Sequence, residues 1–535
     1  MGRTIRICSI ALVMLPALAE ARRAEPSTLG HYVRARLADQ RGQSEAAVRS
    51  YSAALASNPE NVMIALRAYR EAVEAGDYPL AVRSAQTIDR AGVAQPDVHI
   101  LLYISTLRNR DWRAAEQRLA VLVQEPGLGF LAPLLGQWLE VVTRVPLRLR
   151  QPRQMDRTAN AYAVENEALV ALSDGNVDDA VLSIKGLWTL EPYRAGSLRL
   201  AAAAMLVERK QKARALELFV TDDASATKAR SIIENDGNLG ISVSSPLDGA
   251  AFMLARVAGD LIVEGSGRSG MTIARLAEFA APKNARIKLM VAGALSARKD
   301  HDAALVIVDT VVNDPLYGDD AASFRIEQLE ELGRTDTALM EARARAIGSP
   351  NERSRVGDIE LRRGNFSAAA AAYQQALNAQ DAKAGWNLVF ATANAYGNAG
   401  NWAAARPLLE RALAMAPDEP VILNELGYGL ITHGGDLNRG IKLIAQAAAL
   451  RPDDAAIIDS FGWAEYKRGA FDQAIPLLER AVRLDQTQAE IGEHLGDAYW
   501  ATGRKIDARY AWAAARIHAQ GEATARLDGK IAGKQ

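Results

Sequence analysis

A small residue returns about every 34 residues along most of this 535-residue chain. The steps are 34 and 34 in a first run, 35 in a second, and 34, 31, 36, 35, 34 and 34 in a third. A unit of this length is too small to bury a core alone. The period therefore predicts stacked units whose neighbours supply the core. The marker residues are Ala47, Ala81 and Ala115, then Ala180 and Ala215, then Ala304, Ala338, Ala369, Ala405, Gly440, Ala474 and Ala508.

Glycine and proline divide each unit into two helices. A glycine before the marker favours a left-handed cap that ends the first helix, and a proline near the end of the unit stops the second. Gly427, Gly462 and Gly496 are expected to let the helices of a pair touch backbone to backbone. The expected caps are Gly42, Gly76, Gly175, Gly333, Gly364, Gly400, Gly469 and Gly503, and the prolines are Pro59, Pro192, Pro417 and Pro452.

The clearest copy runs from Gly492 to Ala515. It contains Leu495-Gly496 followed by Tyr499, then Ala508, Trp512 and Ala515. This order resembles the L-G-x-x-Y … A-x-x-x-F pattern of tetratricopeptide repeats, with Trp in the Phe position. Alanine-rich runs also favour closely packed helices. The sequence therefore predicts an all-α tetratricopeptide solenoid of about ten to twelve helix pairs.

A narrower resemblance covers residues 386–516. Asp459-Ser460-Phe461-Gly462-Trp463 and Glu493-His494-Leu495-Gly496-Asp497-Ala498-Tyr499-Trp500 resemble the D-S-L-G-W and D-H-L-G-D-A-Y-W signatures of secreted tetratricopeptide proteins of alphaproteobacteria. Leu423-Asn424-Glu425-Leu426-Gly427-Tyr428 is similar to the L-N-Y-L-G-Y element of that family. The chain differs from the family signatures at three positions, Phe461, Glu425 and Glu493. The resemblance implies a solenoid in the cell envelope and brings no defined activity.

The first nineteen residues have the layout of a secretory signal peptide. Arg3 and Arg6 precede an apolar run, and Ala17-Leu18-Ala19 is an A-x-A-like cleavage site, with a second after Ala21. The alternative interpretation is an uncleaved membrane anchor. The apolar run is short for a membrane span, which favours the signal peptide. The sole cysteine, Cys8, lies inside this segment. The mature chain then has no thiol, which suits an oxidising compartment, so we expect a periplasmic protein.

Composition shifts suggest five segments. We expect a signal peptide at 1–19, an N-terminal array at 25–220, a linker or irregular insert at 221–249, a C-terminal array at 250–520, and a flexible tail at 521–535. A second break at 143–157 is rich in arginine, and it is interpreted either as a solvated loop or as a contact for an anionic partner. No segment after residue 19 is apolar enough to span a membrane.

Signs of catalysis are weak. The net charge of −1, with no large basic block, argues against a nucleic-acid binder. The six histidines form no metal-ligand motif, so neither a metal nor a cofactor is expected. Gly265-Ser266-Gly267-Arg268-Ser269-Gly270 fits the G-x-G-x-x-G pattern of dinucleotide sites. Helical apolar spacing on both sides favours a turn between helices, and a nucleotide-using enzyme remains the alternative.

The concave surface formed by the first helices is the expected binding groove. Carboxylates, an amide and aromatic rings suit an extended, neutral or basic peptide. The alternative is that Trp463 and Trp500 pack between repeats. We therefore expect a non-catalytic adaptor for envelope proteins or peptides, with binding of peptidoglycan or exopolysaccharide as the rival function. The predicted groove residues are Asn424, Tyr428, Asp459, Trp463, Tyr466, Glu493, Asp497 and Trp500.

Overall fold

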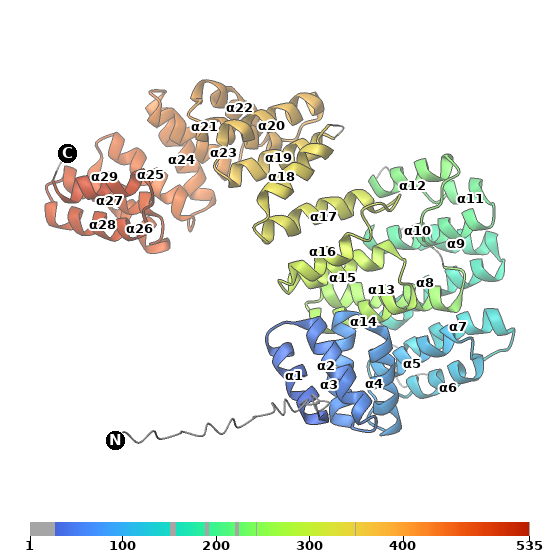
Figure 1. Ribbon diagram of the computed structural model, residues 1–535. Coiled ribbons are helices and arrows are strands. Elements are labelled where there is room, and N and C mark those ends of the chain that lie inside the picture. Colours follow the sequence, from blue (N-terminus) through green and yellow to red (C-terminus); the bar gives the residue numbers. More distant parts are fainter. Residues whose placement is uncertain are drawn as a thin grey trace, which may run out of the picture. The chain divides into compact units, whose positions relative to one another are not determined.

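The computed structural model describes residues 27–149, 157–187, 192–219, 224–241, 243–347 and 349–533. The expected signal peptide lies outside these ranges. Within them, helices α1 to α29 and one 3-10 turn, η2, make up the regular structure, and there is no strand. The all-α prediction is confirmed. Figure 1 shows successive helices stacked along the chain.

Two compact units divide the chain at residues 332 and 333. Unit 1 comprises α1 (Thr28–Gln40), α2 (Ser44–Ser57), α3 (Val62–Ala75), α4 (Tyr78–Arg90), α5 (Pro96–Arg108), α6 (Trp112–Leu122), α7 (Leu131–Thr143), α8 (Arg157–Asp174), α9 (Val177–Gly186), α10 (Pro192–Glu208), α11 (Lys212–Leu216), α12 (Ala224–Glu234), α13 (Pro246–Val263), α14 (Gly267–Ala280), α15 (Ala285–Ala297), α16 (His301–Val308) and α17 (Gly318–Glu331). Unit 2 comprises α18 (Thr335–Arg345), α19 (Pro350–Arg362), α20 (Phe366–Gln380), η2 (Asp381–Lys383), α21 (Trp386–Asn398), α22 (Trp402–Met415), α23 (Pro420–Thr432), α24 (Leu437–Leu450), α25 (Ala455–Lys467), α26 (Phe471–Leu484), α27 (Ala489–Ala501), α28 (Lys505–His518) and α29 (Glu522–Ile531).

Both units are built from helix pairs, with cap glycines at the positions that the sequence predicts. All the expected cap glycines have positive φ, for example Gly76 at +80° and Gly469 at +82°. The close approach of paired helices is also found. A Cβ on Gly462 would lie 2.7 Å from Leu478 Cγ, and one on Gly496 would lie 2.3 Å from Trp512 Cδ1. Leu478 and Trp512 are fully buried. Only glycine therefore permits these helices to pack at this distance.

The segment 221–249 does not separate the two units. Its described part contains α12 and the start of α13, and both belong to unit 1. Ala229 and Ile233 of α12 are buried, as are Leu239 and Val243 in the loop that follows. The Asp-, Ser- and Gly-rich composition suggested a linker, but apolar residues at these positions anchor the segment in the core. The division falls instead before α18.

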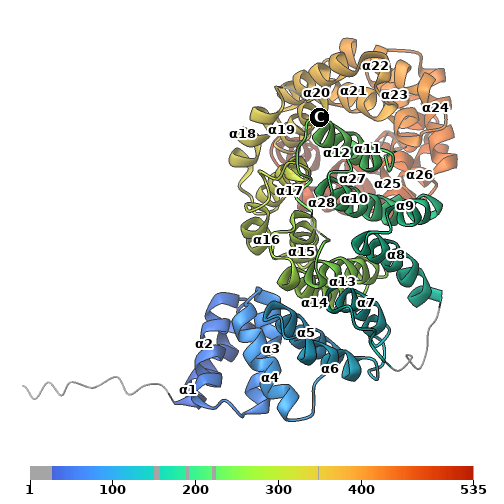
Figure 2. The same cartoon turned by 90° about the vertical axis from the view of Figure 1, so that its right-hand side faces the viewer.

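Unit 1 folds back on itself. Helix α14 packs against α3 and α5, and α13 packs against α5 and α7, an arrangement that Figures 1 and 2 show from two sides. The Arg275 guanidinium of α14 donates a hydrogen bond of 3.0 Å to the carbonyl oxygen of Glu74 at the end of α3. Arg108 of α5 donates to the carbonyl oxygen of Phe279. The α13–α14 pair thus covers α3, α5 and α7, which are successive first helices of unit 1.

A buried ion-pair network holds α13 in place. Arg256 and Glu165 are each 1% exposed. The Arg256 guanidinium lies 3.3 Å from a Glu165 carboxylate oxygen, without hydrogen-bond alignment, and 2.5 Å from Asp260. Glu165 also accepts a 2.8 Å hydrogen bond from Arg194 Nε, and Tyr162 donates to Asp260 at 2.5 Å. Helices α8, α10 and α13 are therefore joined by ion pairs whose partners all lie within unit 1.

Candidate binding surfaces

The first helices of unit 2 place the predicted groove residues in three rows. Counting from the close-contact glycines Gly427, Gly462 and Gly496, the row three residues earlier is Asn424, Asp459 and Glu493. The row one residue later is Tyr428, Trp463 and Asp497, and Tyr466 and Trp500 lie four residues after their glycines. Because a helix turns once in 3.6 residues, these offsets fall on one side of each first helix.

The earliest row is used between repeats. Asp459 of α25 is 5% exposed, and one of its carboxylate oxygens lies 2.8 Å from His494 Nδ1 on the next first helix, α27. Glu493 is also 5% exposed. It receives two 2.8 Å hydrogen bonds from Arg526 and lies 2.7 Å from Lys530 Nζ. Asp459 therefore binds α27 and Glu493 binds α29, and neither is the open groove position that the sequence predicts.

The residues expected to be a flexible tail, 521–535, contain helix α29. Leu527 of this helix is fully buried in a cluster with Trp512, and Lys530 donates 2.7 Å hydrogen bonds to both carboxylate oxygens of Asp497. Burial opposes the charge of Glu493, but hydrogen bonds from Arg526 and Lys530 outweigh it and lower the pKa of this carboxyl to about 2. The segment is polar overall, so the sequence did not indicate that Leu527 would be buried or that Arg526 and Lys530 would form ion pairs with α27.

Aromatic rings are partly packed and partly accessible. Trp463 stacks on His494 with ring centroids 4.0 Å apart and on Tyr466 at 4.7 Å. Lys467 Nζ lies 4.5 Å from the Trp463 ring centroid. Trp500 lies 5.4 Å from the buried Trp512. The Trp463–His494 contact crosses a repeat boundary, as the packing interpretation expects, whereas Trp500 contacts the second helix of its own pair. Both tryptophans keep intermediate exposure.

A smaller open surface remains around α23 and α25. Tyr428 reaches past α25 to Glu490 of α27, with 3.3 Å between its hydroxyl and the carboxylate. Burial raises the pKa of the neighbouring Glu425 carboxyl. Asn424 Oδ1 and Asp459 Oδ1 are buried acceptors without a hydrogen-bond partner in the described structure. We call Asn424, Glu425, Tyr428, Trp463 and Tyr466 the first-helix surface.

The predicted groove residues do not include three participants, Glu425, Glu490 and His494. Glu425 stands beside Asn424 in the Leu423–Tyr428 element, and His494 stands beside Glu493. The positions of Glu425 and His494 in the repeat could therefore have indicated that they contribute to this surface. Glu490 could not be found in this way, because its contact with Tyr428 skips one repeat.

The Gly265–Gly270 motif is a helix–turn–helix connection. Helix α13 continues to Val263, Gly265 has φ +81°, and α14 begins at Gly267. A Cβ on Gly270 would lie 2.6 Å from Ile262 Cγ1, so this glycine serves helix packing. Dinucleotide-binding loops follow a strand, and here the preceding residues are helical. The loop therefore lacks the preceding strand that a dinucleotide-binding motif requires.

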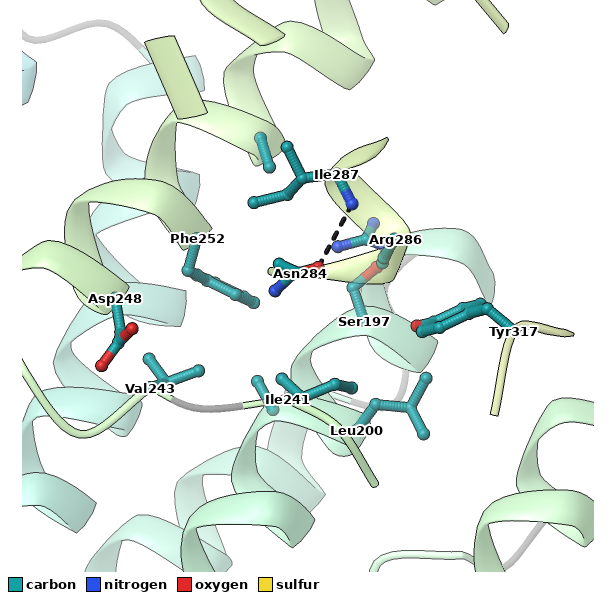
Figure 3. A pocket seen from close by; sticks show the side chains of 12 residues that line it. Ser197, Leu200, Ile241, Val243, Asp248, Phe252, Asn284, Arg286, Ile287 and Tyr317 are labelled. Carbon is teal, nitrogen blue, oxygen red and sulfur yellow. Dashed lines mark hydrogen bonds between the residues drawn. The ribbon is translucent and has the colours of Figure 1, made fainter. Parts of the chain in front are cut away.

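One enclosed pocket in unit 1 is too small for a ligand. Figure 3 shows its lining side chains, including Asn284, whose side-chain oxygen accepts a 3.2 Å hydrogen bond from the Ile287 backbone. The cavity volume is about 20 Å³, which is room for about one water molecule. The described residues contain no group of three or more His, Cys, Asp and Glu that could hold a metal ion. None of the described helices has the length and apolar character required to cross a membrane.

Comparisons with known proteins identify the repeat. Residues 386–429 match a family model described as tetratricopeptide repeat, and residues 462–503 match one described as TPR repeat. No curated protein matches the chain.

Solved structures with similarity to the chain are distant. MamA from Desulfovibrio magneticus RS-1 is 16% identical over 32% of this chain and 94% of that one, with a TM-score of 0.28. MamA MSR-1 is 21% identical over 34% and 97%, with a TM-score of 0.26. The APC/C hetero-tetramer Cut9-Hcn1 is 15% identical over 94% and 96%, with a TM-score of 0.38. The matched repeats and the glycine-capped helix pairs together show an all-α fold that contains tetratricopeptide repeats.

Proposed function

We propose that this protein is a non-catalytic adaptor in the periplasm that binds an extended segment of an envelope protein on the first-helix surface. Tetratricopeptide repeats are typical of protein-interaction scaffolds, and concave repeat surfaces commonly carry the binding site. The periplasmic location rests on the layout of residues 1–19 and on the absence of cysteine after Cys8.

The observation that carries the proposal is the pair of buried acceptors beside partly exposed rings. Asn424 Oδ1 and Asp459 Oδ1 lack hydrogen-bond partners in the described structure. Buried polar atoms are normally paired with protein or ordered water, so each can accept a hydrogen bond that the described residues do not supply. Tyr428 and Trp463 flank them and offer apolar area at small entropic cost. Donor groups of an extended peptide, with a neutral or basic side chain beside Glu425, fit this arrangement.

Photo-crosslinking in living cells tests the proposal. A photoreactive residue replaces Tyr428, Trp463 or Trp500 in turn, and the trapped species are identified by mass spectrometry. The control position is Tyr510 on the second helix α28, which is 74% exposed. We expect one envelope protein to dominate at Tyr428 and Trp463 and to be absent at Tyr510. Equal trapping at all positions, or no protein at any, would contradict the proposal.

The ring stack of Tyr466, Trp463 and His494 supports binding of an envelope glycan as a second candidate. Aromatic faces beside carboxylates also fit sugars. Binding to purified peptidoglycan that is lost in Trp463→Ala, together with glycan fragments in the crosslinked samples, would favour this function. Binding that persists in Trp463→Ala would exclude the stack as its site.

A further inference from the structure

A ligand-sized hollow lies where the α13–α14 pair meets the first helices of unit 1. Its volume is about 610 Å³, within the range of ligand pockets. The start of α5 and the segment before α7 form one side, and the end of α13 with the start of α14 forms the other. Unlike the pocket in Figure 3, it is large enough for a long side chain.

The walls of this hollow are apolar and aromatic. Leu128, Phe130, Leu261 and Ile273 line it. Phe130 stacks on Tyr162 with ring centroids 5.5 Å apart and planes inclined by 20°, which fixes the aromatic wall. Such walls favour the methylene stem of a long side chain over a small hydrated ion.

The rim carries more negative than positive charge. Three carboxylates line the hollow, those of Asp97, Asp260 and Glu264, against one cation, Arg268. Asp260 already has Arg256 at 2.5 Å. Asp97 accepts a 2.9 Å hydrogen bond from the neutral hydroxyl of Tyr69, and Glu264 has no ion-pair partner among the described residues.

Burial raises the pKa of the Asp97 carboxyl, because its charge is partly removed from water and no basic side chain contacts it. His99, two residues further along α5, favours the charged form of Asp97 only weakly. An incoming cation would therefore gain most at Asp97. The same carboxylates disfavour a phosphate at the neighbouring Gly265–Gly270 turn.

We propose that this hollow binds a short segment of a partner polypeptide by taking in the basic side chain of a lysine or arginine. The stem lies between Phe130 and Ile273, the cation lies at Asp97, and Glu264 contributes at the rim. An apolar residue beside the basic one covers Leu128 and Leu261. This site is separate from the first-helix surface, so the two proposals can fail independently.

Isothermal titration calorimetry on the purified protein tests the proposal. The probe is the capped tripeptide N-acetyl-Leu-Lys-Leu-amide, and the comparison peptide carries Glu in place of Lys. We expect the lysine peptide to bind and the glutamate peptide to bind at least tenfold more weakly. Asp97→Asn keeps the acceptor for Tyr69 and removes the charge, so we expect affinity to fall about tenfold to a hundredfold.

Matched variants separate the site from a general charge effect. Glu264→Gln is expected to weaken binding about threefold, as a rim charge does. Asp179→Asn, at an exposed position on α9, is expected to leave affinity unchanged. Unchanged melting temperatures show that the variants remain folded. Equal affinity for the two peptides, no effect of Asp97→Asn, or hexylamine binding as tightly as the lysine peptide would overturn the proposal.

Discussion

The two units carry the same kind of helix pair and use their first helices in opposite ways. In unit 1, α13 and α14 lie over α3, α5 and α7, and one continuous apolar cluster runs from Ala35 to Leu316. In unit 2 the buried apolar residues fall into several smaller clusters along the stack. Helix α29 reaches only the last first helix, α27, through its basic side chains.

This difference shows that a repeat signature predicts the helix pair. It does not predict which elements pack on the first helix of that pair. A first-helix surface that packs on its own chain contributes to stability. One that stays open retains polar atoms such as Asn424 Oδ1 without partners. Stability variants should therefore have their largest effects in unit 1, and binding variants should act in unit 2.

The largest effect is expected for Arg256→Ala. This change leaves the buried Glu165 with only Arg194 and leaves the partly exposed Asp260 without its cation. Breaking a buried pair commonly costs about 3–5 kcal/mol. Urea unfolding followed by circular dichroism should show this loss. The control, Arg298→Ala, removes a half-exposed pair with Glu74 and should cost under about 1 kcal/mol. Similar losses for both variants would refute the network.

Gly249→Ala is expected to loosen α13 from α7. The added Cβ would lie 2.3 Å from Trp138 Cδ2, so the ring or the helix must move. Overpacking of this kind costs about 3 kcal/mol at the upper end of its usual range. Hydrogen exchange should accelerate in α13 and α7 and stay unchanged in α23 to α27. Gly293→Ala, which meets no atom within 4 Å, is the matched control.

Removing both cations of α29, with Arg526→Ala and Lys530→Ala together, should destabilise unit 2 by about 2 kcal/mol at pH 7. The folded-state pKa of Glu493 is lowered from 4.5 to about 2. The stabilisation is therefore fully present above pH 4.5 and is lost as the pH falls towards 2. Unfolding curves at a series of pH values should show wild type and variant converging over this window. A difference that persists at pH 2 would contradict the assignment.

The smallest effect is expected for Tyr428→Phe, which removes the 3.3 Å contact with Glu490. A partly exposed hydrogen bond of this length should contribute about 0.5 kcal/mol. Chemical unfolding checks the value, with Tyr510→Phe as a control at an exposed position. If Tyr428 also lies on the binding surface, partner capture falls in this variant more than its stability does.

Local chemistry made the repeat predictable, because each cap glycine and each close-contact glycine is required by the backbone of its own pair. The covering of unit 1 was not predictable in this way. Arg275 meets Glu74 across 201 residues, and no local pattern marks such a contact. The predicted groove residues share one side of each first helix, but the partners of Asp459 and Glu493 lie one repeat further on. Their burial depended on neighbours that a single repeat does not contain.

The most direct test of this contrast compares one photoreactive position in each unit in living cells. Tyr78 lies 5.4 Å from Phe279 of α14, measured between ring centroids, and Trp463 lies on the first-helix surface. We predict that a probe at Tyr78 crosslinks to residues of α14 in the same chain, whereas a probe at Trp463 traps a second protein. Trapping of a second protein at Tyr78 and only intrachain products at Trp463 would contradict the account.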